Sequence, residues 1–188
     1  MKSKTILQVE DDPNDVFLFQ HALAKAGVMN PIQVATDGQQ AIDYLGGTGK
    51  FADREKHPFP CLVLLDLKLP YVMGLDVLKW IRQQPCAALT VLMLTASGEE
   101  ADVVASYRLG ANGFLTKPSQ ASKLQDMVKA IADFWLTHNM LPHESSAESP
   151  MEGVVSLVRS TTTDFAPRNR PVNGKRREEW PSDAEPKP

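Results

Sequence analysis

The stretch CLVLLDLKLP, residues 61–70, decides the fold of this chain. The apolar run from Cys61 to Leu65 is typical of a strand that is buried on both faces of a parallel sheet. The run ends at Asp66, a carboxylate whose burial costs free energy unless a partner binds it. The stretch therefore predicts an interior strand with an acid at its carboxyl end that has a binding partner.

Short apolar runs and helical patterns alternate along the first 138 residues. We predict strands over 6–9, 32–35, 62–66, 91–95 and 114–116, and helices over 13–26, 38–45, 75–83, 99–109 and 120–138. Five such alternations predict an α/β, doubly wound, three-layer sandwich in which helices cover both faces of a parallel sheet. Ligands bind such sheets outside the carboxyl ends of the strands.

Charged residues occupy three of these strand ends. Glu10 and Asp11 follow the first strand, Asp66 ends the third, and Lys117 follows the fifth. Because the ends meet at one edge of the sheet, we expect these side chains to cluster. Magnesium prefers oxygen ligands, so we predict a Mg²⁺ site formed by Glu10, Asp11, Asp66 and a backbone carbonyl, that of Lys68. Asp12 precedes Pro13 and is instead expected to cap a helix.

A carboxylate beside a bound cation can attack an electrophilic phosphorus and form an aspartyl phosphate. Asp66 is the residue that we expect to be modified in this way. Lys117 would present a positive charge to the phosphoryl group, and the Thr95 hydroxyl, at the end of the fourth strand, would donate to the same group.

Four motifs occur together in a compatible order: VEDD (9–12), LLDLKLP (64–70) followed by Gly74, MLTAS (93–97) and LGANGFLTKP (109–118). With them, residues 4–138 resemble the receiver domain of two-component response regulators, a CheY-like family. The resemblance implies a flavodoxin-like (βα)5 fold with sheet order 2-1-3-4-5.

The resemblance also implies roles for individual residues. Asp66 matches the phosphoacceptor, which takes a phosphoryl group from the phosphohistidine of a sensor histidine kinase or a phosphotransfer protein. Glu10 and Asp11 match the acidic pair that holds magnesium, with Lys68 supplying a carbonyl. Such a protein catalyses only its own phosphorylation and dephosphorylation, and is expected in the cytoplasm.

Two further matches concern the response to phosphate. Thr95 and Lys117 match the residues that contact the phosphoryl group. Phe114 matches the switch aromatic, which turns inward when the threonine moves toward phosphate. Because Phe114 replaces the frequent tyrosine, it has no hydroxyl for signalling contacts.

The connection over residues 46–60 is longer than in a minimal receiver. With PND (13–15) and FLFQ (17–20), it resembles single-domain regulators associated with phytochromes, which implies a light-sensing or other hybrid kinase as partner and dimerisation. From the residues alone, the connection is either a solvated surface loop or a loop that contacts a partner.

Residues 139–188 differ in composition, since they hold half of the 14 prolines and many polar residues. We predict a receiver domain over 1–138 and a disordered tail over 139–188. No output domain is evident in this tail, although Met151–Val158 is an apolar segment that would suit docking.

Several partners follow from these observations. The expected output is a phosphorylation-dependent change in the binding of a downstream protein, with homodimerisation through the fourth helix, fifth strand and fifth helix as a further expectation. The net charge of -3 and the absence of a long apolar run give no reason to expect nucleic acid or a membrane. The basic run at 175–177 leaves one alternative, a DNA-binding transcriptional regulator. A hydrolase or a flavin protein on the same fold is another.

Overall fold

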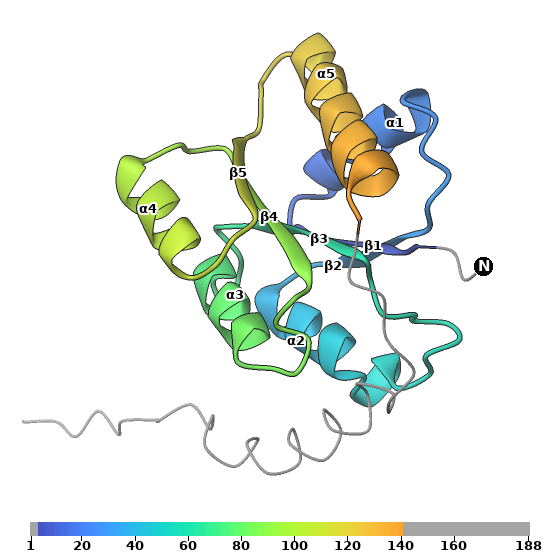
Figure 1. Ribbon diagram of the computed structural model, residues 1–188, viewed down its shortest axis with the longest axis vertical. Helices are drawn as coiled ribbons and strands as arrows, with labels where there is room; N and C mark the ends of the chain where they lie inside the picture. Colours follow the sequence, from blue (N-terminus) through green and yellow to red (C-terminus); the bar gives the residue numbers. More distant parts are fainter. Residues whose placement is uncertain (1–3, 141–188) are drawn as a thin grey trace, which may run out of the picture.

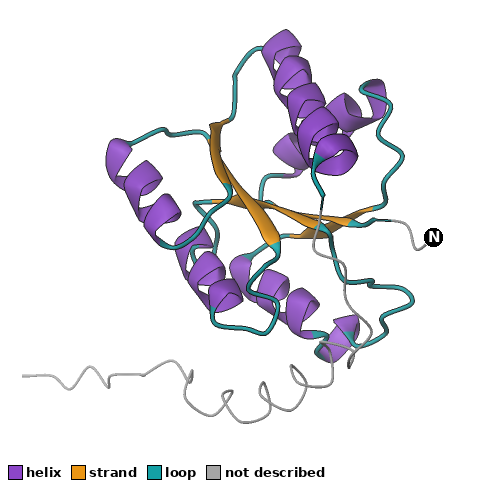
Figure 2. Ribbon diagram, in the orientation of Figure 1, coloured by secondary structure: helices purple, strands orange, loops and turns teal. Residues whose placement is uncertain are grey.

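The computed structural model describes residues 4–140, which form one parallel sheet between two layers of helices (Figure 2). The strands are β1 (Ile6–Val9), β2 (Ile32–Ala35), β3 (Leu62–Asp66), β4 (Thr90–Thr95) and β5 (Gly113–Thr116). They pair in the order β2-β1-β3-β4-β5, all parallel. The predicted fold class and strand order are therefore confirmed.

Helices cover both faces of this sheet (Figure 1). They are α1 (Pro13–Lys25), α2 (Gly38–Gly46), α3 (Gly74–Arg82), α4 (Glu100–Arg108) and α5 (Ala121–Ile131). The helices α1 and α5 pack together on one face, α2 and α3 on the other, and α4 packs beside β5 and α3. Except at the end of α5, the predicted element boundaries agree with these within one residue.

The strand β3 is buried along its whole length and contributes side chains to two hydrophobic cores. Val63 and Leu65 belong to the core under α2 and α3, whereas Leu62 and Leu64 belong to the core under α1 and α5. This alternation explains why the strand has an unbroken apolar sequence, since both of its faces are covered. It also fixes Asp66 at a buried position.

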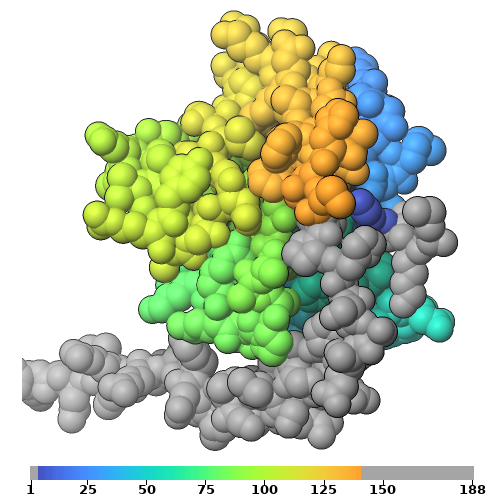
Figure 3. Space-filling model, in the orientation of Figure 1, coloured from blue at the N-terminus to red at the C-terminus, as the bar shows by residue number. Residues whose placement is uncertain are grey.

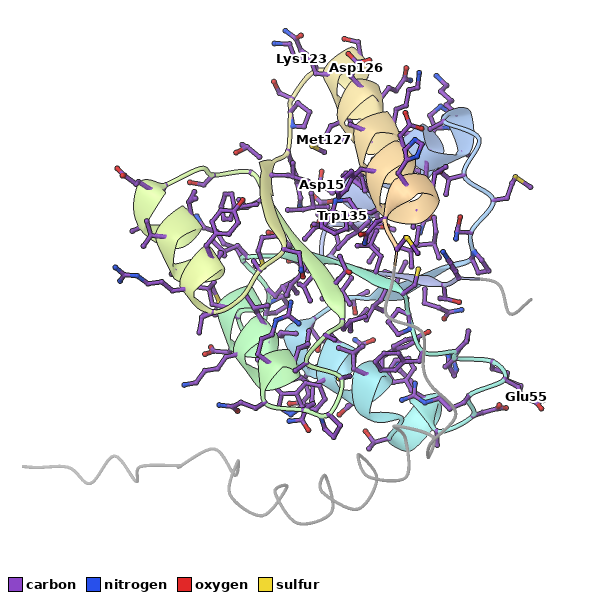
Figure 4. All side chains as sticks on the ribbon, viewed as in Figure 1. Asp15, Glu55, Lys123, Asp126, Met127 and Trp135 are labelled. Atoms are coloured by element: carbon purple, nitrogen blue, oxygen red, sulfur yellow. The ribbon has the colours of Figure 1, made fainter. Side chains whose placement is uncertain are left out.

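The last helix differs from the prediction. In a regular helix over 120–138, Phe134 would lie on the same face as Ile131, three residues earlier. Instead a π-helical segment, Ala132–His138, follows α5. Its wider turn changes which side chains face the core. Trp135, which is labelled in Figure 4, and Leu136 pack against the core under α1 and α5, while Phe134 is 54% exposed.

The 46–60 connection is anchored to α2 and is not simply a solvated loop. Phe51 is buried, with its ring edge-on to that of Tyr44 at a centroid distance of 5.3 Å. The Arg54 guanidinium donates to the carbonyl oxygens of Tyr44 (2.7 Å) and Leu45 (2.8 Å). These carbonyls belong to the last turn of α2, where helix geometry leaves carbonyl oxygens without the usual partner four residues later. The Tyr44 oxygen accepts, besides the bond from Arg54, one of 3.2 Å from the backbone N–H of Gly47. Contact between this connection and another protein stays a prediction.

Several predictions from the sequence concern residues outside the described range. The predicted tail lies, from residue 141 onward, outside that range, and so do Met151–Val158 and the basic run at 175–177. Within residues 4–140, no helix is long and apolar enough to cross a membrane.

Arg54→Ala tests whether the 46–60 connection stabilises the fold. Removal of hydrogen bonds from a charged donor to helix-terminal carbonyls is expected to lower the free energy of unfolding by about 2 kcal/mol. Urea unfolding followed by circular dichroism measures this. Lys56→Ala is the matched control, because the only ion pair of this exposed lysine within residues 4–140 is with Asp53. This substitution is expected to change the free energy of unfolding by less than about 0.5 kcal/mol. Equal stability of the two variants would contradict the anchoring role of Arg54.

Candidate phosphoacceptor and cation site

The structure brings the predicted strand-end residues to one edge of the sheet. Glu10 directly follows β1, and Asp66, the last residue of β3, lies opposite Leu94 of β4. Thr95 ends β4, and its carbonyl oxygen accepts a hydrogen bond of 2.7 Å from the backbone N–H of Lys117, just after β5. Parallel pairing thus places residues that are far apart in the sequence side by side.

The Lys117 ammonium is the centre of the cluster. Its Nζ lies 2.6 Å from Asp66 Oδ2 and 3.0 Å from Asp15 Oδ2, and it also donates to Glu10 Oε2. The side chains of Glu10, Asp66 and Lys117 are only 5%, 10% and 14% exposed. The charges are therefore largely withdrawn from water, and the single ammonium offsets only part of the carboxylate charge.

Three carboxylates at this edge are suited to holding a metal ion. Oxygen atoms from Glu10, Asp11 and Asp66 all lie within 4.8 Å of one another. Three hard oxygen donors fit a divalent cation such as Mg²⁺. Asp12 is not part of this group. It caps α1, accepting a 2.8 Å hydrogen bond from the backbone N–H of Asn14, as its place before Pro13 predicted.

The electrostatics show that the site carries more acid than one lysine neutralises. Burial raises the pKa of Glu10 to about 7, and this effect outweighs the opposing hydrogen bond from Lys117. Burial alone would lower the pKa of Lys117, but hydrogen bonds to Asp66, Glu10 and Asp15 raise it above its ordinary value. The lysine therefore stays charged, while Glu10 holds a proton near neutral pH unless further positive charge arrives.

The chain folds back sharply after Asp66. The Asp66 Oδ1 atom accepts a 3.2 Å hydrogen bond from the backbone N–H of Lys68. A Cβ atom on Gly74 would lie 2.1 Å from the carbonyl oxygen of Asp66, so only glycine fits where α3 begins. The Gly74 of the sequence motif is thus explained by close approach to the acid. Coordination by the Lys68 carbonyl stays a prediction.

The predicted switch residues lie beside the charged cluster. Thr95 is buried, and its hydroxyl accepts a 3.2 Å hydrogen bond from the backbone N–H of Ser97. Strand alternation puts Thr95 on the same face as Phe114, which packs, partly buried, against the core under α2 and α3. Within residues 4–140, no hydrogen bond joins the Thr95 hydroxyl to Asp66 or Lys117. Both switch roles stay predictions.

Two residues near this edge were not predicted from the sequence. Asp15 lies in the first turn of α1, where an acid ordinarily indicates only helix stabilisation. Tyr71 is almost fully exposed and has a φ of 63°. The Val72 N–H donates to the Pro70 carbonyl oxygen (2.8 Å), closing a three-residue turn that is strained for a side chain of this size. Nothing in the sequence around Tyr71 indicated this conformation.

Comparison with known proteins decides the family. The profile of the response regulator receiver domain matches residues 6–129. The chain belongs to the response regulator receiver family. Response regulator Rcp1 of Synechocystis sp. is 39% identical over 140 residues, which cover 74% of this chain and 93% of Rcp1.

Solved structures of receiver proteins agree with this fold. The Mn²⁺-bound form of Rcp1 superimposes with a TM-score of 0.68 and covers 74% of this chain and 99% of Rcp1 at 39% identity. The phosphorylated cyanobacterial phytochrome response regulator RcpA has a TM-score of 0.70 at 37% identity, with coverage of 75% and 99%. The bacteriophytochrome response regulator AtBRR has a TM-score of 0.61 at 41% identity, with coverage of 76% and 100%. The predicted resemblance to phytochrome-associated regulators is confirmed.

Membership of this family sets the class of function. The protein is a receiver of two-component signalling and not an ordinary enzyme. Receiver domains interact with histidine kinases or phosphotransfer proteins. Three carboxylates cluster at the strand ends of this receiver, and the structure of the similar protein Rcp1 contains Mn²⁺.

The raised pKa of Glu10 predicts the pH dependence of stability in metal-free protein. The folded state binds a proton at Glu10 up to about pH 7, because burial raises the pKa of this carboxyl, whereas the unfolded state releases the proton near the ordinary pKa of 4.5. This stabilisation is complete below the pKa of the unfolded state and is lost as the pH rises through the pKa of the folded state. From about pH 5 to about pH 8 in EDTA, the receiver should lose about 1–2 kcal/mol more of its unfolding free energy than its Glu10→Gln variant. Urea unfolding at both pH values measures the difference, and an identical pH dependence of the two proteins would contradict the assignment.

Proposed function

We propose that this receiver accepts a phosphoryl group on Asp66, in the presence of Mg²⁺, and thereby changes its affinity for partner proteins. The observation that supports this most directly is the contact of the buried Asp66 carboxylate with Lys117, beside Glu10 and Asp11. A carboxylate with a fixed ammonium and an acidic cation site next to it has what phosphoryl transfer needs, namely a nucleophile and positive charge for the transferred group.

The transfer would proceed at the edge of the sheet. An oxygen of Asp66 forms a bond to phosphorus, while the phosphorus–nitrogen bond of a phosphohistidine breaks and its electron pair stays on the imidazole nitrogen. Lys117 offsets the negative charge on the phosphoryl oxygens, and the Thr95 hydroxyl donates to one of them. A bound Mg²⁺ would supply further positive charge at the phosphoryl group. Glu10, Asp11, Asp66 and the Lys68 carbonyl are the groups that would hold it.

Thr95 and Phe114 would carry the signal away from Asp66. They lie on the same face of neighbouring strands, so a displacement of the threonine toward the phosphoryl group would leave space into which the aromatic ring can move. The surface formed by α4, β5 and α5 would change with it. In Figure 3, α4 and α5 both lie on the visible face of the molecule.

The phosphodonor would be a sensor histidine kinase or a phosphotransfer protein. Several relatives are named as phytochrome response regulators, which favours a light-sensing kinase. Phe17 and Leu18 are exposed on α1, whereas Phe19 and Leu23 of the same helix are buried. We propose that this apolar surface, so close to the charged cluster, docks the helices of the phosphodonor.

The output would be binding of a downstream protein. Val104 and Tyr107 are exposed on α4. A shallow hollow lies along this helix and is lined by residues that include Ala101, Val104 and Leu109. This surface is our candidate for homodimerisation through α4, β5 and α5. The alternative, a transcriptional regulator that contacts DNA through its basic tail, would be favoured by salt-dependent DNA binding that is lost on removal of residues 139–188. On this proposal the protein acts in the cytoplasm, and its receiver domain spans residues 1–138.

Incubation with phosphoramidate and Mg²⁺, followed by intact mass measurement, tests the proposed function. We expect one phosphoryl group per chain, labile in base, because an acyl phosphate on Asp66 hydrolyses readily. Asp66→Ala should abolish the incorporation and EDTA should prevent it, since the site would lose its nucleophile or its cation. Asp76→Asn, which changes an exposed acid on α3, is the control and should leave it intact. Incorporation that survives Asp66→Ala would contradict the proposal.

Leu18→Ala tests the docking surface separately. Phosphotransfer from the sensor kinase should slow by about tenfold, because the loss of a buried apolar contact costs about 1.4 kcal/mol of docking energy. Phosphorylation by phosphoramidate should not change, since a small donor needs no docking surface. Ala substitution of Met29, an exposed apolar residue beyond the carboxyl end of α1, is the control. An unchanged rate from the kinase would exclude this role for Leu18.

A further inference from the structure

Lys117 has a third carboxylate neighbour that the proposed chemistry does not use. An ammonium group has three N–H donors, and those of Lys117 are directed to Glu10, Asp66 and Asp15. Asp15 belongs to α1 and not to the sheet edge, and in Figure 4 its label lies between α5 and β5. The Asp15 side chain is 40% exposed, so Asp15 contacts Lys117 from the solvent-facing side of the cluster.

Two of the three lysine partners are also members of the acid cluster. Glu10 and Asp66, with Asp11, form the group whose oxygen atoms lie within 4.8 Å of one another. A divalent cation in that group would bind the same two carboxylates, Glu10 and Asp66, that now accept hydrogen bonds from Lys117. Cation and ammonium also repel each other at such distances. Lysine and cation therefore compete for Glu10 and Asp66.

Asp15 is the one of these three carboxylates for which a cation in the acid cluster would not compete with Lys117. Among residues 4–140, the acid cluster comprises Glu10, Asp11 and Asp66, and Asp15 lies outside it. Its Oδ2 atom is 3.0 Å from Lys117 Nζ. When a cation occupies the cluster, Asp15 can keep its hydrogen bond to the ammonium and offset part of the repulsion between the two positive charges.

We propose that Asp15 is a positioning residue that holds the Lys117 ammonium beside Asp66 while a divalent cation occupies the acid cluster. This inference rests on the proposed function, because it assigns Asp15 to the same phosphorylation site. Asp15 acts only through Lys117 and touches neither the cation nor the phosphoryl group. Without it, the lysine depends entirely on Glu10 and Asp66, so it opposes cation binding more strongly.

The local structure explains why Asp15 can do this. Asp12 caps α1 and Pro13 begins it, which fixes the first turn of the helix relative to β1. Asp15 is the third residue of that turn, and it points at a lysine that follows β5, 102 residues later in the chain. The competing explanation is that Asp15 only stabilises the helix amino terminus, as first-turn acids commonly do. That role predicts no effect on Lys117.

A matched control is available in α3. Asp76 is the third residue of α3, just as Asp15 is of α1; it is exposed and begins the helix that follows Asp66. Within residues 4–140, it makes no hydrogen bond or ion pair with Lys117. Asp76→Asn therefore removes one first-turn charge from the same edge of the sheet and leaves the lysine untouched.

Calorimetric titration of the full chain with Mg²⁺, and with Mn²⁺ as a second probe, tests the proposal. Asp15→Asn should weaken cation binding by about tenfold, the effect typical of losing a group that supports a metal site. Asp76→Asn should weaken it by less than about twofold, because an exposed charge is screened. Asp15→Glu, which retains the carboxylate, should recover most of the affinity.

A double-mutant comparison separates action through the lysine from a simple loss of charge. In a Lys117→Met background the competing ammonium is gone, so Asp15→Asn should change cation affinity by less than about twofold. An equal effect of Asp15→Asn with and without Lys117, or equal effects of Asp15→Asn and Asp76→Asn, would overturn the proposal. Circular dichroism verifies that each variant is folded, and Lys117→Gln replaces Lys117→Met if the latter is not.

The rate of phosphorylation by phosphoramidate gives a second measurement. At saturating Mg²⁺, Asp15→Asn should remain slower than wild type by about tenfold, because the ammonium is no longer held at Asp66. A rate equal to wild type would overturn the proposal, since helix stabilisation alone predicts it. A wild-type chain that gains no phosphoryl group would instead overturn the proposed function, and the cation affinities would still decide whether Asp15 acts through Lys117.

Discussion

The structure depends on one ammonium group that three carboxylates share. Lys117 joins the end of β5 to the ends of β1 and β3 and to the first turn of α1. Without it, Glu10 and Asp66 would be buried acids beside one another, an arrangement that costs several kcal/mol. Burial of apolar side chains stabilises the sheet. The charges at its edge decide which ionisable side chains can be buried together there.

The positive charge of Lys117 does not fully offset the carboxylates around it. The remaining negative charge is what could attract a cation to the site. Burial raises the pKa of Glu10 even though a lysine is in contact with it, so the cluster still favours additional positive charge. A divalent cation would satisfy that demand and, on the proposal made above, would compete with Lys117 for Glu10 and Asp66. An ammonium that can exchange its hydrogen-bond acceptors in this way can donate to a phosphoryl oxygen with little reorganisation of the site. Asp15 gives it an outer partner throughout.

Most of the fold and much of the site followed from local patterns. The strand segments were evident because both faces of a parallel sheet are covered, which requires continuous apolar runs such as that ending at Asp66. Asp12 was assigned to helix capping because Pro13 follows it. The change of face after Ile131 was not predictable, since a π-helical turn leaves no periodic signal in so short a segment. The anchoring of Phe51 and Arg54 was missed because composition alone does not reveal a tertiary contact.

The sequence by itself determined the order of strands and helices and the residues that end the strands, because hydrophobic periodicity and strand-end charges are local properties. Only the tertiary structure decided which of these charges touch. The pairing of Asp15 with Lys117 depends on where α1 begins relative to β5, and the close approach of Gly74 to the Asp66 carbonyl oxygen depends on how α3 packs against the end of β3. Distances between groups that lie far apart along the chain are set by packing, and packing is not a property of any one segment.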